Sequence, residues 1–143
     1  MSVITDIADM VVVSLNSRSF ARPFTAERLY QPTFELAEMD TLHVSVVPKS
    51  MTVEPATRLD VFCDCTIDIG VQQRVDPQDQ TTLDALVGLA EAIGDHLRTT
   101  RLEGVTDCLW MVTRHEPLLS VEHLDQFRQF TSVITVTYRV KRR

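Results

Sequence analysis

Three aspartates spaced four residues apart are the first side chains in this sequence that could do chemistry together. Paired carboxylates share a proton or bind a divalent cation only when they lie close together. Asp60, Asp64 and Asp68 fall in an alternating segment, and a strand would separate neighbours by ~13 Å, which is too far for either role. Two interpretations stay open: a solvated sheet face, or a negatively charged surface that repels DNA sliding past it.

The other polar residues match no catalytic or cofactor template. The sequence contains no Gly-x-Ser-x-Gly elbow, no Gly-rich phosphate loop and no dinucleotide fingerprint. Pro117 interrupts the zinc-peptidase pattern that His115-Glu116 begins, and the histidines lie in different predicted elements. We therefore expect no catalytic residue, no cofactor and no enzyme activity. A spatial convergence of His115, His123 and Cys108 stays open at this stage.

The cysteines predict neither a disulfide framework nor a metal centre. There are three, and Cys63 and Cys65 sit two apart in a strand pattern, where they are poorly placed to bridge each other. Without a second pair or a nearby histidine, a Cys-x-Cys is a weak metal signal, so we interpret these residues as buried thiols. No signal-peptide pattern and no apolar run of ~18–20 residues is present, so we expect folding in a cytoplasm and no membrane contact.

Hydrophobic periodicity divides the chain into helices and strands. Apolar residues recur every three or four positions over 2–15, where Ser2 or Thr5 would cap a helix, and again from 79–82 to Leu97. Strict alternation, which indicates a half-buried strand, occupies other segments. In chain order the predicted strands are 24–34 (near an edge), 42–46 (ended by Pro48), 59–71, 108–112 (more fully buried) and 129–141, with 35–40 as a helical turn or loop and 116–126 as a polar connection.

This element order predicts a single α+β domain over residues 1–143. The sheet is mixed and mainly antiparallel, because the alternation over 59–71 and 129–141 is typical of strands with one face on a core and one in water. Two helices pack on one face of the sheet. An apolar fraction of 44% in 143 residues is sufficient for a buried core.

Two of the predicted strands are too long for a lone domain of this size. Residues 59–71 and 129–141 would each span ~43 Å, whereas a compact chain of this length has a diameter somewhat under ~40 Å. Such a strand must bend within one twisted sheet or project as an arm, and a projecting arm leaves backbone groups unpaired. We therefore predict β-arm or edge contacts between subunits, with a twisted or bulged monomeric sheet as the alternative.

The charge of the chain argues against nucleic-acid binding. The formal net charge is −6 and the pI is about 5.1, which is the wrong sign for phosphate contacts. The basic C-terminal end is an exception, either as a solvated tail or as a contact to an acidic neighbour. The predicted subunit or partner interface comprises Lys49, Ser50, Met51, Glu116, Glu122, Arg139, Lys141, Arg142 and Arg143.

Several runs of the sequence resemble small proteins of phage and prophage structural gene clusters. These runs are Phe24–Arg28 (FTAER), Leu42–Lys49 (LHVSVVPK), Ile67–Gln72 (IDIGVQ) and Leu124–Ile134 (LDQFRQFTSVI). The element order also resembles the tail terminators of long-tailed bacteriophages of the phage lambda type. That resemblance implies a small protein in a hexameric ring, which caps the tail tube and meets the head connector.

The resemblance also implies a location and a set of partners. The chain would be a non-enzymatic virion protein of the neck, assembled in the bacterial host cytoplasm, in contact with the tail tube protein and the head–tail connector or stopper protein. DNA would pass without specific binding, beside Asp60, Asp64 and Asp68. The alternatives are another neck component (a head-completion or tail-completion protein), a small module that binds a ligand between helices and sheet, and an enzyme that uses scattered His, Cys and Asp residues.

Overall fold

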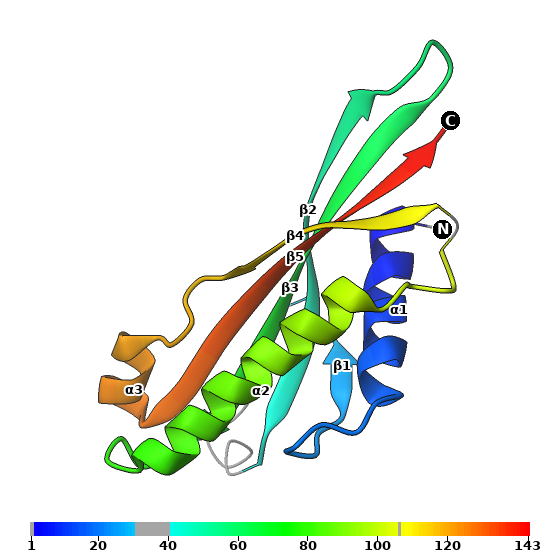
Figure 1. Ribbon diagram of the computed structural model, residues 1–143. Coiled ribbons are helices and arrows are strands. Elements are labelled where there is room, and N and C mark those ends of the chain that lie inside the picture. Colours follow the sequence, from blue (N-terminus) through cyan, green and yellow to red (C-terminus); the bar gives the residue numbers. More distant parts are fainter. Residues whose placement is uncertain (1, 31–40, 106) are drawn as a thin grey trace.

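A mixed five-stranded sheet organises the computed structural model, which describes residues 2–30, 41–105 and 107–143. The elements are α1 (Val3–Asn16), β1 (Ala26–Arg28), β2 (His43–Pro55), β3 (Val61–Arg74), α2 (Gln80–Thr99), β4 (Cys108–His115), α3 (Val121–Phe127) and β5 (Gln129–Arg142). The strand order is β1-β2-β3-β5-β4 (Figure 1). β1 runs parallel to β2, and every other neighbouring pair is antiparallel. The predicted α+β class is therefore confirmed.

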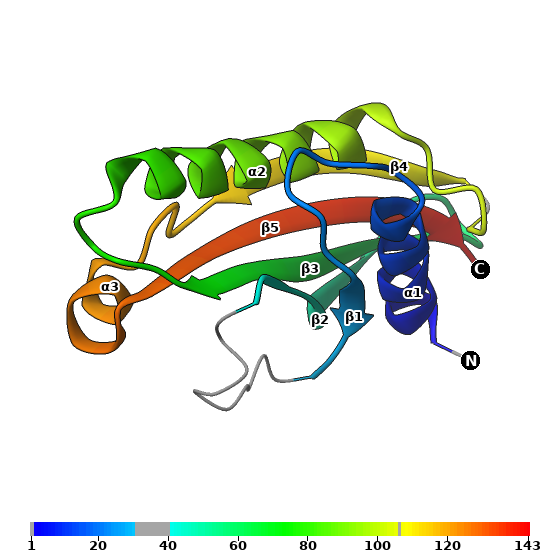
Figure 2. The same cartoon turned by 90° about the horizontal axis from the view of Figure 1, so that it is seen from below.

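Both predicted helices form, and they pack on the same face of the sheet. α1 lies along β1 and β2, and α2 lies along β4 and β5 (Figure 2). Fully buried side chains of the helices meet alternate side chains of the central strands in one core. The largest of these are Ile7 and Leu15 of α1, Leu86 and Ile93 of α2, Ile67 and Ile69 of β3, and Phe130, Ile134 and Tyr138 of β5. Asp79 caps α2 by accepting a hydrogen bond from the Thr82 N–H at 3.1 Å.

The long strands are present and they extend past the helices. β2 contains 13 residues, and β3 and β5 contain 14 each. Figure 1 shows the β2–β3 hairpin and the end of β5 projecting from one end of the molecule. The turn of the β2–β3 hairpin is held by a hydrogen bond that the Ala56 N–H donates to the Asp60 carbonyl at 3.0 Å. In β2, the residues Lys49–Pro55 are all exposed, so this half of the strand has no helix over it.

The prediction that Pro48 ends its strand is wrong. β2 continues to Pro55 after a bulge at Lys49, because the pairing with β3 shifts between Pro48 and Ser50. β1 pairs only with residues 44–46 of β2, so Pro48 already lies on a sheet edge. An edge strand tolerates a proline next to a bulge, since the missing N–H does not interrupt a ladder on both sides.

The prediction of a more fully buried strand at 108–112 is also wrong. β4 is the outermost strand, and Leu109, Met111 and Val112 are exposed. A second bulge lies between Trp110 and Val112. It moves Val112 to the opposite face from Cys108 and Trp110, which point toward the helices. The apolar run that we interpreted as a core strand therefore lies along an edge.

The segment predicted as a polar connection, 116–126, contains most of α3. Ser120 begins this helix by accepting a hydrogen bond from the His123 N–H at 3.3 Å, and Arg128 ends it in the left-handed conformation. His123 Nδ1 lies 2.9 Å from the Thr131 hydroxyl of β5, on the face opposite to α1 and α2. α3 has seven residues and none of them is buried, so no apolar stripe marks it in the sequence.

Other differences from the prediction lie at the ends of elements. Only residues 26–28 of the predicted strand 24–34 are β-structure among the described residues, while 31–34 and the segment 35–40 lie outside them. Ser2 occupies the N-cap position of α1, but its side chain makes no capping hydrogen bond. Leu59 precedes β3 and is 66% exposed, rather than lying on the buried face.

Candidate functional site

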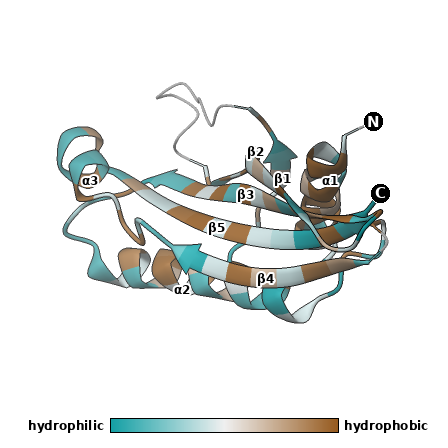
Figure 3. Cartoon of the chain, turned by 90° about the horizontal axis from the view of Figure 1, so that it is seen from above, coloured by the Kyte–Doolittle hydropathy of each residue, from teal (hydrophilic) through white to brown (hydrophobic). Residues whose placement is uncertain are grey.

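The face of the sheet opposite α1 and α2, called the open face below, carries most of the predicted site residues. Strand pairing sets Asp64 beside Arg139, Thr66 beside Thr137, and Asp68 beside Thr135. These side chains point away from the core because the residues between them, such as Cys65 and Ile67, are fully buried. Figure 3 shows the resulting mixture of polar and apolar residues along β4 and β5.

An ion pair with two hydrogen bonds anchors the open face at Asp64. The Arg139 Nε and Nη2 atoms donate to the Asp64 carboxylate at 2.8 and 3.0 Å. The same guanidinium lies 4.6 Å from the ring centre of Phe62, which explains this one large apolar residue on a polar strand face. The hydrogen bonds from Arg139 lower the pKa of Asp64 below its usual value, since they favour the charged carboxylate.

The other two aspartates of the predicted acidic row also face cations. Lys49 Nζ lies 3.8 Å from Asp68, which additionally accepts a 2.7 Å hydrogen bond from the Thr135 hydroxyl. Lys141 Nζ lies 3.8 Å from Asp60. The row is therefore a ladder of opposite charges rather than a line of free carboxylates. That the ladder lines a DNA passage stays a prediction, but the surface is less negative than the sequence suggests.

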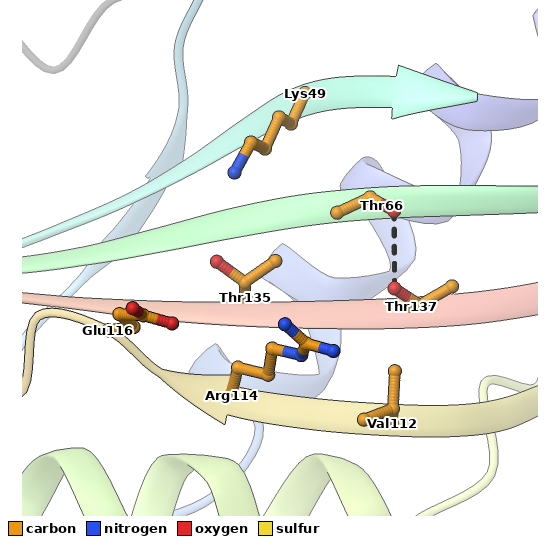
Figure 4. Close-up of a pocket in the computed structure, with 7 residues that line it drawn as sticks. All are labelled: Lys49, Thr66, Val112, Arg114, Glu116, Thr135 and Thr137. Carbon is orange, nitrogen blue, oxygen red and sulfur yellow. Dashed lines mark hydrogen bonds between the residues drawn. The ribbon is translucent and has the colours of Figure 1, made fainter.

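A shallow hollow of about 390 Å³ lies on the open face between β2 and the end of β4 (Figure 4). Its lining comprises Lys49, Thr66, Val112, Arg114, Glu116, Thr135 and Thr137. The hydroxyls of Thr66 and Thr137 lie 3.2 Å apart and bond to each other rather than to a base. No histidine or cysteine contributes to this lining. Its chemistry suits polar contact with another surface.

A serine–histidine contact links α1 and α2, but its geometry does not suit catalysis. Ser14 Oγ lies 2.9 Å from His96 Nε2, while Arg18 Nη1 and Thr100 Oγ1 lie 3.3 and 3.2 Å from Nδ1. A guanidinium only donates, so Nδ1 accepts and Nε2 carries the proton. His96 therefore presents an N–H to Ser14 and cannot remove the proton of the serine. Burial lowers the pKa of His96 and keeps it neutral.

The cysteines are three separate buried thiols, as predicted. Burial raises the pKa of Cys65 and of Cys108 to about 11, so neither is a thiolate at neutral pH. Cys108 and His115 occupy opposite ends of β4, ~23 Å apart at the rise of a strand, so the convergence of His115, His123 and Cys108 does not occur. Within residues 2–30, 41–105 and 107–143, no three metal-binding side chains gather.

All of the predicted interface residues except Glu122 lie on β2, on β5 or directly after β4 or β5. Arg139 and Lys141 join the aspartate ladder, and Glu116 lies in the hollow. Lys49, Ser50 and Met51 lie on the exposed half of β2. Arg142 ends β5 at the level of Pro55, on the other side of β3, and Arg143 follows it. Glu122 is apart from all of these, in the first turn of α3 at the far end of the molecule (Figure 1).

Sequence reasoning missed the outer edge of β4 as a candidate surface. Leu109 is 59% exposed there, and on the exposed half of β2, Met51 and Val53 are 48% and 52% exposed. Among the described strands, none pairs with β2 beyond Val46 on its outer side or with the outer side of β4. An alternating apolar run looks the same in sequence on an edge and in a centre, so only the strand order could find these surfaces.

Comparison with known proteins identifies no family for the chain. Neither a protein-family model nor a curated protein matches the sequence. None of the helices in the described part of the chain has the length and hydropathy of a membrane span. The surfaces that remain to explain are therefore the open face and the two unpaired sheet edges.

Proposed function

We propose that this protein is a non-enzymatic, ring-forming structural protein of the neck of a long-tailed phage. In this role it is a tail terminator, which caps the tail tube and joins it to the head connector. Its partners are further copies of itself in a ring of about six, the tail tube protein and the connector or stopper protein. It acts in the virion, after assembly in the cytoplasm of the bacterial host.

The observation that carries the proposal is that the sheet extends beyond the helices that cover it. The Lys49–Pro55 half of β2 is exposed along its whole length, and its outer edge offers unpaired backbone groups. Isolated proteins protect such edges, because an open edge recruits other strands. A protein that functions by assembly uses such edges for contacts between subunits instead. The predicted arm and the resemblance in sequence pattern support the same conclusion.

The charge distribution suits a duct through which DNA slides. A net charge of −6 gives no general attraction for phosphates, and three cations of the open face, Lys49, Arg139 and Lys141, each have a carboxylate beside them. Phosphate contacts need cations that are free to replace counterions, and Lys49, Arg139 and Lys141 are already paired. DNA would therefore pass this surface without specific binding.

The alternative of a small ligand-binding module has less support. It places a pocket between the helices and the sheet, but that space is filled by fully buried side chains of the core. The hollows lie on the surface instead, such as one of about 290 Å³ between α1 and the Thr100–Gly104 loop. A surface hollow of this kind encloses less of a ligand than an ordinary binding pocket does.

Inactivation of the gene in the phage or prophage that carries it tests the proposed function. We expect electron microscopy of the lysate to show full heads without tails and tails of irregular length. Expression of the wild-type chain from a plasmid should restore joined particles, and antibody labelling should mark the head–tail junction. Normal particle yield would overturn the proposal. Tails of normal length beside heads that leak DNA would assign the chain to the head-completion class instead.

A further inference from the structure

Two stretches of sheet edge that no described strand pairs with, the outer side of β2 beyond Val46 and the outer side of β4, lie at the same level along the strands. Following the register across the sheet from Thr52 of β2 leads to Asp64, then to Arg139, and then to Leu109 of β4. Val53 leads in the same way through Cys63 and Val140 to Cys108. The free half of β2 is the part beyond Val46, residues 47–55. This half and the whole of β4 therefore face outward from opposite sides of the same end of the sheet.

The strand directions match as well as the levels. Each step from β2 through β3 and β5 to β4 is antiparallel, so β2 and β4 run in opposite directions. A second copy rotated about an axis along the strands keeps its β2 direction. Its β2 would therefore lie antiparallel to the β4 of the first copy, which is the pairing that extended edges form most readily.

We infer that the free half of β2, residues 47–55, pairs antiparallel with β4 of the next copy and continues the sheet from subunit to subunit. At equal level, Met51 lies opposite Trp110, Val53 opposite Cys108, and Thr52 opposite Leu109 of the neighbour. Such a contact is head to tail, and its repetition around an axis without a rise closes a ring. This contact, called the joint, would connect the subunits of the ring in the proposed function. The inference rests on the ring, but it does not depend on the position of the ring in the virion.

The side chains on the two edges are complementary in this register. Met51 and Val53 point to the helix side of the sheet, because they pair with the buried Cys65 and Cys63, yet none of the described elements of their own copy covers them. The helix side of β4 borders a hollow of about 370 Å³. Its lining includes Leu102, Cys108, Trp110 and Tyr138. Met51 and Val53 of the next copy would fill this hollow and remove its apolar surface from water.

The direction of the side chains, rather than their charge, sets the register of the pairing. Glu54 lies at the far end of the free β2 segment and faces the open side. The neighbour's hollow beside Leu109 is lined by both Arg101 and Asp107, so Glu54 would meet charges of both signs there. A shift of one residue would move the apolar side chains of Met51 and Val53 to the wrong face, because successive side chains of a strand point to opposite faces. The register therefore has one preferred value.

Matched charge substitutions on the hairpin test the joint first. Met51→Glu and Val53→Glu place a carboxylate in the joint, and we expect mass measurement in solution to fall from a ring to the 16.2 kDa of one chain. Leu59→Glu is the control, because it is equally exposed on the same hairpin but lies in the turn. It should retain the ring mass. All three sites are exposed, so circular dichroism should report an unchanged fold. Rings that persist in both joint variants would overturn the inference.

Engineered cysteines test the register. Oxidation of Thr52→Cys together with Leu109→Cys should give a ladder of covalent oligomers, and Thr52→Cys with Arg114→Cys should give none, because Arg114 lies four ladder positions, or ~13 Å, further along the sheet. Equal cross-linking of both pairs would refute the register.

If the ring forms through this joint but gene inactivation leaves particles normal, the joint stands and the proposed function fails. A ring formed through another surface overturns the joint alone.

Discussion

His96 lies buried between α1 and α2, with Ser14 at one ring nitrogen and Arg18 and Thr100 at the other. A second proton would have to sit on Nδ1, directly against the guanidinium of Arg18. Burial and this neighbour both lower the pKa of His96, with burial as the larger cause. The side chain therefore contributes to stability only while it is neutral.

This gives a pH dependence with a definite sign. Because the folded pKa is lowered, the contribution of His96 is complete above the unfolded value of about 6.5 and is lost as the pH falls through the folded pKa. In urea titrations, wild-type stability should drop between pH 7.5 and pH 5, which lie on either side of the unfolded value of about 6.5. His96→Gln should be less stable at the higher pH but should lose less on acidification.

The control for this experiment is His43→Gln, which changes a histidine outside the α1–α2 contact. It should keep the wild-type dependence on pH. An equal loss of stability on acidification in wild type and His96→Gln would show that another group is responsible.

At the scale of elements, α2 shows how docking compensates for a weak helix. It carries two glycines, Gly88 and Gly94, which lower its intrinsic stability. Yet Leu86, Ile93 and Leu97 are fully buried against the sheet. Burial of one such side chain contributes about 1.5–3 kcal/mol, which exceeds the cost of about 1 kcal/mol for each glycine. Packing rather than propensity therefore holds this helix.

The two glycines of α2 should respond differently to the same substitution. A Cβ at Gly88 would meet nothing within 4 Å, whereas one at Gly94 would lie 3.0 Å from His115 Nε2 and 3.4 Å from Thr113 Cγ2. We expect Gly88→Ala to raise the free energy of unfolding by about 0.5–1 kcal/mol. Gly94→Ala should gain less, because it forces β4 away from the helix. Chemical denaturation measures both, and an equal gain would mean that His115 moves freely.

At the scale of the whole molecule, the balance of charge on the open face decides how DNA meets it. The wild-type chain should not bind double-stranded DNA even at about 50 mM salt, because its net charge is −6 and Lys49, Arg139 and Lys141 of the open face are paired. The triple variant Asp60→Asn, Asp64→Asn, Asp68→Asn removes the carboxylates that face Lys49, Arg139 and Lys141. It should bind weakly, and added salt should abolish the binding.

Fluorescence anisotropy of a labelled duplex measures both proteins. A thermal melt of the triple variant should first establish that it remains folded. Tight binding by the wild-type chain would argue against a duct that DNA passes freely.

Sequence reasoning succeeded where one physical signal determined the result. The periodicity of α1 and α2 reports a helix with one buried face, and the alternation of β3 and β5 reports a strand with one face on the core. Both patterns are local, so they can be recognised without knowing which other segments of the chain pack against them. The cysteines were recognisable as buried thiols for the same reason, since they sit among apolar residues of such a strand. The aspartates were placed on the correct face, but their cations were not foreseen.

The sequence by itself determined the α+β class, the two helices that cover one face, the unusual length of the strands and the overall negative charge. Only the tertiary structure decided that β2 continues beyond Pro48, that β4 is an edge and that α3 forms. It also decided that Asp60, Asp64 and Asp68 face Lys141, Arg139 and Lys49. The physical reason is that periodicity records only which face a residue occupies. Strand order and register, which choose its neighbours, depend on contacts between segments far apart in the chain.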